Sequence, residues 1–145
     1  GMKKYEQEPG FETRIANTIL GSLWGLITMP FRKKASPIDR SRVQAAWQEV
    51  ERLADGSYQE VKLAVVKADS VLDGILKLKV GGETMGERLK NAEPRFNRQT
   101  YSNLWDAHKL RNLLVHDPKY QLTHRQAILA VEAFEAVLRE LGALS

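Results

Sequence analysis

A regular succession of helix start and stop signals along residues 36–145, with apolar residues spaced by three and four between them, constrains the fold more than any other feature. In a capping box, Ser or Thr at the N-cap is followed three positions later by Glu or Gln, and two backbone N–H groups at the helix start are satisfied. Three pairs match this pattern: Ser57 with Glu60, Thr84 with Glu87, and Thr123 with Gln126. No segment alternates polar and apolar residues with the period of a strand. The chain is therefore predicted to be all-α.

These signals divide residues 36–145 into five expected helices. The first begins with an N-cap at Ser36 and Pro37 in the first helical position, and it ends at residue 55, before Gly56. The other helices are expected from residue 57 to the glycines at 81 and 82, at 84–91, at 99–116, and from 123 to the last apolar residues. Because the connections are short, the pattern favours an antiparallel four- to five-helix bundle.

Residues 1–35 are predicted to form a separate N-terminal tail with an extra apolar helix. The stretch from Ile15 to Phe31 contains no charged residue and is close to the lower length limit of a membrane span. Polar residues dilute its apolarity, while Gly21 and Gly25 would let two helices approach closely. Two interpretations stay open: a soluble or interfacial helix, which includes a dimer contact, and a membrane anchor.

The net charge of +4 is concentrated in residues 95–125. This segment holds six Lys or Arg against two Asp, so the rest of the chain is neutral overall, and all three His lie in it as well. Such a concentration of positive charge attracts anionic ligands, of which phosphate is the obvious class. The absence of Cys excludes disulfides and thiolate sites and fits a reducing compartment. We expect a cytoplasmic protein, attached to the inner face of the membrane if the apolar stretch enters lipid.

The expected helix at 99–116 has two distinct faces. Its core period runs through Leu104, Ala107, Leu110 or Arg111, and Leu114. A polar and aromatic face holds Tyr101, Trp105, His108, Asn112 and His116. Since a helix advances about 100° per residue, Arg111 lies about 140° from His116 around the axis. The two side chains would converge if the helix end unwinds near Pro118, or if two copies meet across a two-fold axis. The spacing therefore favours a dimeric site.

An Arg followed by Asn, and then by His five positions after the Arg, resembles the signature of the HEPN superfamily when it ends the penultimate helix. The matching residues are Arg111, Asn112 and His116. The context adds to the resemblance, because the segment LWDAHKLRNLLVHD ends a helix and the segment VVKADSVLDGIL lies upstream. The similarity to small bacterial HEPN-like proteins covers roughly residues 40–142.

The resemblance implies a helical bundle that often dimerises, and it implies metal-independent ribonuclease activity, which many members have. It assigns His116 as general acid or base, Arg111 as the group that holds the scissile phosphate, and Asn112 as the residue that orients the site. Further candidates for contact with phosphate or RNA are Lys109, His108 and Lys119. No cofactor and no metal is predicted. Some family members pair as toxins with a nucleotidyltransferase antitoxin, but no residue of this chain indicates such a partner.

Structural interpretations of the same residues stay open beside the catalytic one. Arg111 could form a salt bridge with Asp69 or Asp73 on the second helix, and His116 could favour the negative end of the helix dipole. His108 is expected to be exposed to solvent or to lie in a dimer interface. Asp69 and Asp73 are four residues apart, but no third ligand is placed to complete a cation site. The alternative function is a non-catalytic dimerisation or interaction module, with or without membrane attachment.

Overall fold

The structure is a computed structural model that describes residues 37–145. The predictions for the apolar stretch at 15–31 and for an N-cap at Ser36 lie outside these residues. The described part of the chain folds into five packed α-helices without a strand, which confirms the all-α prediction. The helices are α2 (Arg40–Ala54), α3 (Tyr58–Lys79), α4 (Met85–Ala92), α5 (Arg98–His116) and α6 (His124–Glu140), and a short 3-10 turn, η2 (Glu93–Arg95), follows α4.

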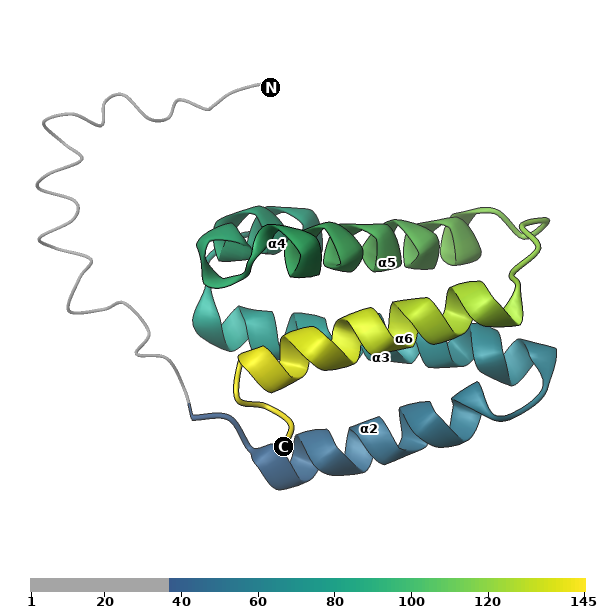
Figure 1. The fold of residues 1–145 in the computed structure, drawn as a ribbon, viewed down its shortest axis with the longest axis horizontal. Helices are drawn as coiled ribbons and strands as arrows, with labels where there is room; N and C mark the ends of the chain where they lie inside the picture. The colour runs from purple at the N-terminus through teal and green to yellow at the C-terminus, as the bar shows by residue number, and fades with distance from the viewer. Residues whose placement is uncertain (1–36) are drawn as a thin grey trace, which may run out of the picture. The chain divides into compact units, whose positions relative to one another are not determined.

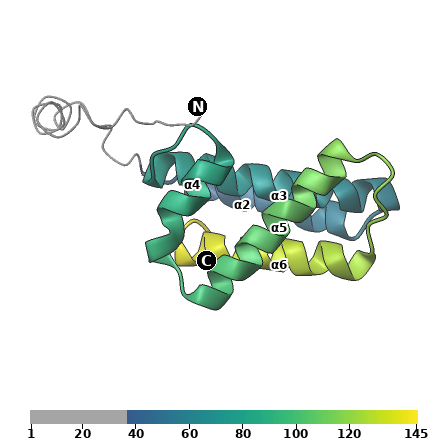
Figure 2. The same ribbon diagram turned by 90° about the horizontal axis from the view of Figure 1, so that it is seen from above.

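The long helices run in alternating directions, and α3 is the central one. It packs against α2, α5 and α6, while α5 and α6 also pack against each other. Figure 1 shows α5 and α2 on opposite sides of the layer that α3 and α6 form. Figure 2 shows α5 crossing over α3 and α6 from the outer side. One side of α5 therefore faces the core, and the other side is left uncovered by these helices.

The capping signals in the sequence position the helix starts. Ser57 and Thr123 each accept a hydrogen bond from the backbone N–H three residues on, and the capping boxes with Glu60 and Gln126 are complete. The box expected at Thr84 is only half formed: Thr84 Oγ1 accepts from the N–H of Glu87, but the Glu87 carboxylate accepts from the N–H of Glu83. A short polar side chain at the N-cap is thus enough to begin each of these helices.

The first described helix begins later than the sequence predicts. Residues 37–39 are not helical, and the N-cap is Asp39, whose carboxylate accepts a hydrogen bond from Arg42 N at 3.1 Å. A carboxylate caps a helix as well as a hydroxyl does, so Asp39 takes the role that the sequence assigned to Ser36. The prediction that Pro37 occupies the first helical position is therefore wrong.

The core is apolar and runs the length of the bundle between the helices. Its largest fully buried side chains include Trp47 from α2, Leu72 and Leu76 from α3, Leu104 from α5, and Phe134 from α6. Each fully buried side chain of this size contributes about 1.5–3 kcal/mol through removal of apolar surface from water. The core period of α5 runs through Leu110 and not through Arg111, which settles the choice that the sequence left open.

Candidate functional site

The predicted catalytic residues Arg111, Asn112 and His116 lie on the second half of α5. Asn97 caps the start of α5, its side chain accepting from Thr100 N at 2.8 Å. The helix ends at His116, and Pro118 follows within the connection to α6. That connection is tied to α3, because Leu122 N donates to the hydroxyl of Tyr58 at 3.0 Å. Asn97 thus fixes the start of α5, and Tyr58 holds the connection that follows its end.

Four side chains of α3 and α5 form a ring of polar contacts that leads from the buried Asp69 and His108 to the partly exposed Asn112 and Arg111. The ring nitrogen Nδ1 of His108 lies 2.8 Å from Oδ1 of Asp69. Nε2 of the same imidazole lies 3.5 Å from Nδ2 of Asn112, whose Oδ1 accepts a hydrogen bond of 2.9 Å from Nη1 of Arg111. Nε of Arg111 closes the ring at 3.6 Å from Oδ2 of Asp69. The salt-bridge alternative for Arg111 and Asp69 is therefore confirmed.

The donors and acceptors of this ring agree with only one form of His108. A carboxylate only accepts hydrogen bonds, so Nδ1 of His108 carries the hydrogen that it donates to Asp69. The carbonyl oxygen of Asn112 is occupied by Arg111, so its amide nitrogen faces Nε2 of His108 and donates to it. The ring is thus satisfied by a neutral imidazole with its hydrogen on Nδ1, and the orientation of Asn112 follows from that tautomer.

His108 is buried, with 6% of its surface exposed, so the expectation that it is exposed to solvent is wrong. A buried imidazole needs a partner for each ring nitrogen, and both partners come from the ring described above. Trp105 covers it from the same helix in an edge-to-face contact with ring centroids 6.0 Å apart. This burial argues against direct contact of His108 with phosphate or RNA.

Arg111 is only partly buried, and 31% of its side chain is exposed. Its guanidinium has five N–H donors, of which one is used by Asn112 and one, on Nε, faces Asp69 beyond hydrogen-bond distance. Within residues 37–145, the Nη2 group forms no hydrogen bond. Arg111 is therefore held at Nη1 by a hydrogen bond and at Nε by the nearby charge of Asp69, and within the described residues its Nη2 donors are left for an oxyanion.

His116 is exposed at the last position of α5 and forms no hydrogen bond or ion pair with the described residues. It lies about 140° from Arg111 around the helix axis, and α5 does not unwind before it. One copy of the described chain thus does not bring these two side chains together. The exposed end of a helix also suits a histidine that favours the helix dipole.

Lys109 and Lys119 are both exposed, as a contact with phosphate requires. Lys119 lies in the loop after α5, where its N–H donates to the carboxylate of Asp117 at 3.0 Å. Both remain predictions as ligands.

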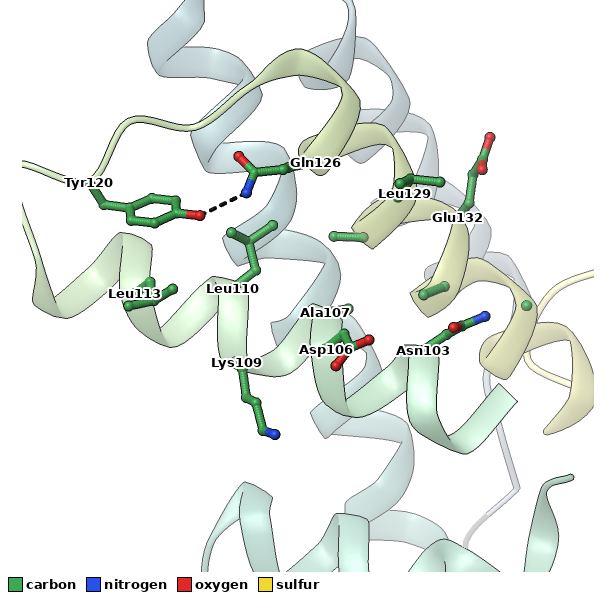
Figure 3. Close-up of a pocket in the computed structure, with 13 residues that line it drawn as sticks. Asn103, Asp106, Ala107, Lys109, Leu110, Leu113, Tyr120, Gln126, Leu129 and Glu132 are labelled. Carbon is green, nitrogen blue, oxygen red and sulfur yellow. Dashed lines mark hydrogen bonds between the residues drawn. The ribbon is translucent and has the colours of Figure 1, made fainter. Parts of the chain in front are cut away.

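An open groove of about 520 Å³ lies between α5 and α6, on the side of α5 away from Arg111. Figure 3 shows Leu110 and Leu113 along α5, with Leu129 facing them from α6. Tyr120 closes one end and accepts a hydrogen bond of 2.8 Å from Gln126. The groove is mostly apolar, and neither Arg111 nor His116 is among the residues that line it. The sequence had not indicated this groove.

Asp73, the other carboxylate considered as a partner for Arg111, pairs with Arg88 of α4. Nε and Nη2 of Arg88 donate to the two carboxylate oxygens at 2.7 and 3.1 Å, and Nη1 donates to the carbonyl of Gly82 at 2.8 Å. Asp73 raises the pKa of Arg88 through these hydrogen bonds. Within residues 37–145 there is no group of three or more His, Asp or Glu placed to hold a metal ion.

No helix within residues 37–145 is both long enough and apolar enough to span a membrane. Comparisons with models of protein families, with curated proteins and with solved structures found no match.

Proposed function

We propose that this chain is a HEPN-type domain that binds RNA or nucleotide phosphate on α5 and, as a homodimer, cleaves RNA without a metal. The observation that carries the proposal is the state of Arg111, whose Nη1 donates to Asn112 and whose Nε lies 3.6 Å from Asp69, while its Nη2 donors form no hydrogen bond within residues 37–145. A guanidinium held in this way meets two oxygens of a phosphate with its forked donors.

The proposed reaction divides its work among three residues. His116 removes the proton of a ribose 2′-hydroxyl, whose oxygen attacks the adjacent phosphorus, and the bond to the 5′-oxygen breaks. Arg111 stabilises the negative charge that develops on the phosphoryl oxygens, and Asn112 keeps Arg111 in position. The leaving 5′-oxygen takes up a proton, and the products are a 2′,3′-cyclic phosphate and a 5′-hydroxyl end. An exposed imidazole suits the proton transfer, because one of its two ring nitrogens can accept a proton while the other carries one.

A second copy of the chain supplies the His116 that Arg111 of the first copy does not reach. Arg111 and His116 point in different directions from the same helix, so a shared cleft requires α5 helices that face each other across a two-fold axis. The outer side of α5 is left uncovered by the other described helices and carries Lys109, Asn112 and His116 within about 60° of one another around the axis. The excess positive charge of residues 95–125 attracts RNA to this side.

The test is incubation of the full chain with a mixed single-stranded RNA pool in EDTA, followed by analysis of the product ends. We expect cleavage that leaves 2′,3′-cyclic phosphates, and its loss by about 10²-fold or more in Arg111→Ala and in His116→Ala. His124→Ala is the matched control, because His124 is equally exposed at a helix end. Absence of cleavage and of RNA binding by the wild type, or equal activity of the three variants, would contradict the proposal.

A second candidate function, favoured by the α5–α6 groove, is a dimerisation module without catalysis. Leu113 and Leu129 are large apolar side chains that are exposed at the groove. Lys109 lies at one edge of the groove and Glu132 at the other, so in a two-fold arrangement each could face the opposite charge of the second copy. A stable dimer of wild type that neither binds nor cleaves RNA would favour this candidate.

A further inference from the structure

We infer that Asp69 and His108 are positioning residues that hold Arg111 in the orientation in which it binds phosphate. The inference rests on the proposed role of Arg111 and extends the site from α5 to α3. Neither residue reaches the surface, since both are buried, so they act through Asn112 and Arg111 and not on the ligand.

The contact between α3 and α5 is otherwise apolar, and the ring stands out within it. Leu72 and Leu104 are fully buried in this region, as are Val65 and Ala68 on the same helix as Asp69. A buried carboxylate and imidazole cost desolvation that apolar side chains of similar volume would avoid. Apolar side chains would thus fill this contact at least as well as the polar pair, which favours a role for Asp69 and His108 in orienting Arg111.

The polar groups of the ring lead step by step to the exposed guanidinium. Asp69 makes two contacts, one to His108 and one to Nε of Arg111. His108 in turn orients the amide of Asn112, which receives the Nη1 hydrogen of Arg111. Two separate atoms of the guanidinium are thus placed by partners that are themselves fixed, so the plane of the group is defined before a ligand arrives. Such preorganisation lowers the ordering cost at the moment of binding and reaction.

The role of His108 depends on its neutral form. With its hydrogen on Nδ1, the unprotonated Nε2 accepts from Asn112 and turns the carbonyl of Asn112 toward Arg111. A side chain that only donates at this place would turn the amide round, and a donor of Asn112 would then face a donor of Arg111.

Asp69→Asn is the most direct test, because it keeps the size of the side chain. Its carbonyl oxygen can still accept from His108, but its amide group faces Nε of Arg111 with a donor. Asp73→Asn is the matched control, since it makes the same change one turn further along α3 and disturbs the Arg88 pair, which does not contact Arg111. His108→Phe serves as a second variant, because the aromatic ring keeps the shape of the side chain but can neither donate to Asp69 nor accept from Asn112.

The first readout is independent of RNA. In the full chain, the Nε–H signal of Arg111 is identified by its absence in Arg111→Lys, and its hydrogen exchange is measured by NMR. We expect exchange to become about tenfold faster or more in Asp69→Asn and in His108→Phe, and to stay within about twofold of wild type in Asp73→Asn. Equal acceleration in Asp69→Asn and Asp73→Asn would overturn the inference, because general loosening of α3 would then explain both.

The second readout is RNA cleavage. We expect kcat to fall on the order of 10²-fold in Asp69→Asn, with KM changed by less than about threefold, because a misplaced group loses most in the transition state. An unchanged kcat despite faster Nε exchange would overturn the positioning role. If wild type has no activity, the proposed function fails, whereas the exchange measurement still decides whether Asp69 and His108 hold Arg111.

Discussion

Asp73 and Arg88 form an ion pair whose two members are buried to different extents. We therefore expect replacement of Asp73 and replacement of Arg88 to lower the free energy of unfolding by different amounts. The Arg88 side chain is 8% exposed and forms an ion pair with Asp73, which is 21% exposed and also lies 3.8 Å from Lys77. In Asp73→Ala, a buried guanidinium loses this ion pair and keeps the carbonyl of Gly82 as its hydrogen-bond partner, with weaker attraction from Glu87 and Glu83. In Arg88→Met, an apolar side chain fills much of the space, and the remaining carboxylate has both solvent and Lys77.

These environments set the magnitudes. Leaving a buried charge without its partner costs about 3–5 kcal/mol, so we expect this loss in the free energy of unfolding for Asp73→Ala. For Arg88→Met we expect about 1–2 kcal/mol, because the hydrogen bonds are lost while the partly exposed carboxylate is rehydrated. The double variant Asp73→Ala/Arg88→Met should be more stable than Asp73→Ala alone, since it no longer contains an unpaired buried charge.

Urea unfolding followed by far-UV circular dichroism measures these differences, provided that the slope m is the same in all variants. The comparison uses wild type, the two single variants and the double variant of the full chain. Arg88→Met costing as much as Asp73→Ala, or a double variant that is less stable than both single variants, would refute the reasoning from unequal burial.

Two other perturbations test the groove and the first turn of α3. The dimerisation module proposed as the second candidate function predicts that Leu129→Asp loses the wild-type dimer in sedimentation equilibrium with unchanged helicity, because a charge is placed in an exposed apolar groove. A dimer that persists would exclude the groove as its interface and agrees with a dimer formed through the outer side of α5. The N–H of Ser57 holds the pKa of Glu60 below its ordinary value, and a depressed pKa adds stability that is present at neutral pH and lost as the pH falls through the folded value. Wild type should therefore lose its advantage over Glu60→Gln in thermal unfolding from about pH 5 downward, and an advantage that grows in acid would contradict this sign.

Much of the fold follows from short-range signals in the sequence. Asn97, Ser57 and Thr123 begin helices because their side chains accept the N–H groups that a helix start leaves free. The end of α6 also depends on a nearby residue, Gly142. Gly142 has a φ of +77° and turns the chain so that Ala143 N reaches Leu138 O at 2.8 Å. This is a Schellman ending, which the periodicity of α6 does not reveal.

The position of the first helix start shows where local signals compete. Ser36 and Asp39 are both good N-cap residues, and Pro37 suits the first helical turn, so the sequence supports either start. The structure begins α2 after Asp39, which leaves Val43 and Trp47 on the buried side. The choice depends on how α2 packs against α3, and helix propensity contains no information about that contact.

Which polar residues of α5 meet a partner was also beyond the sequence. Helical spacing places His108 beside Asn112 on one face and identifies Asp69 as a candidate partner for Arg111. It does not tell whether that face turns outward or toward α3, and a rotation of α5 by a few tens of degrees would expose His108 and bury other residues. The burial of His108 against Asp69, and the apolar groove on the other flank of α5, arise from the crossing of α5 over α3 and α6.

The amino-acid sequence is sufficient to predict the helices and the chemical character of α5, because capping and periodicity depend on residues within a turn or two of each other. The joining of Asp69 to Arg111 through His108 and Asn112 connects residues about 40 positions apart. The groove, which lies on the other side of α5 from Arg111, forms where α5 packs against α6. Those relations are set by the angle and rotation at which whole helices pack, and packing is a property of all their contacts at once.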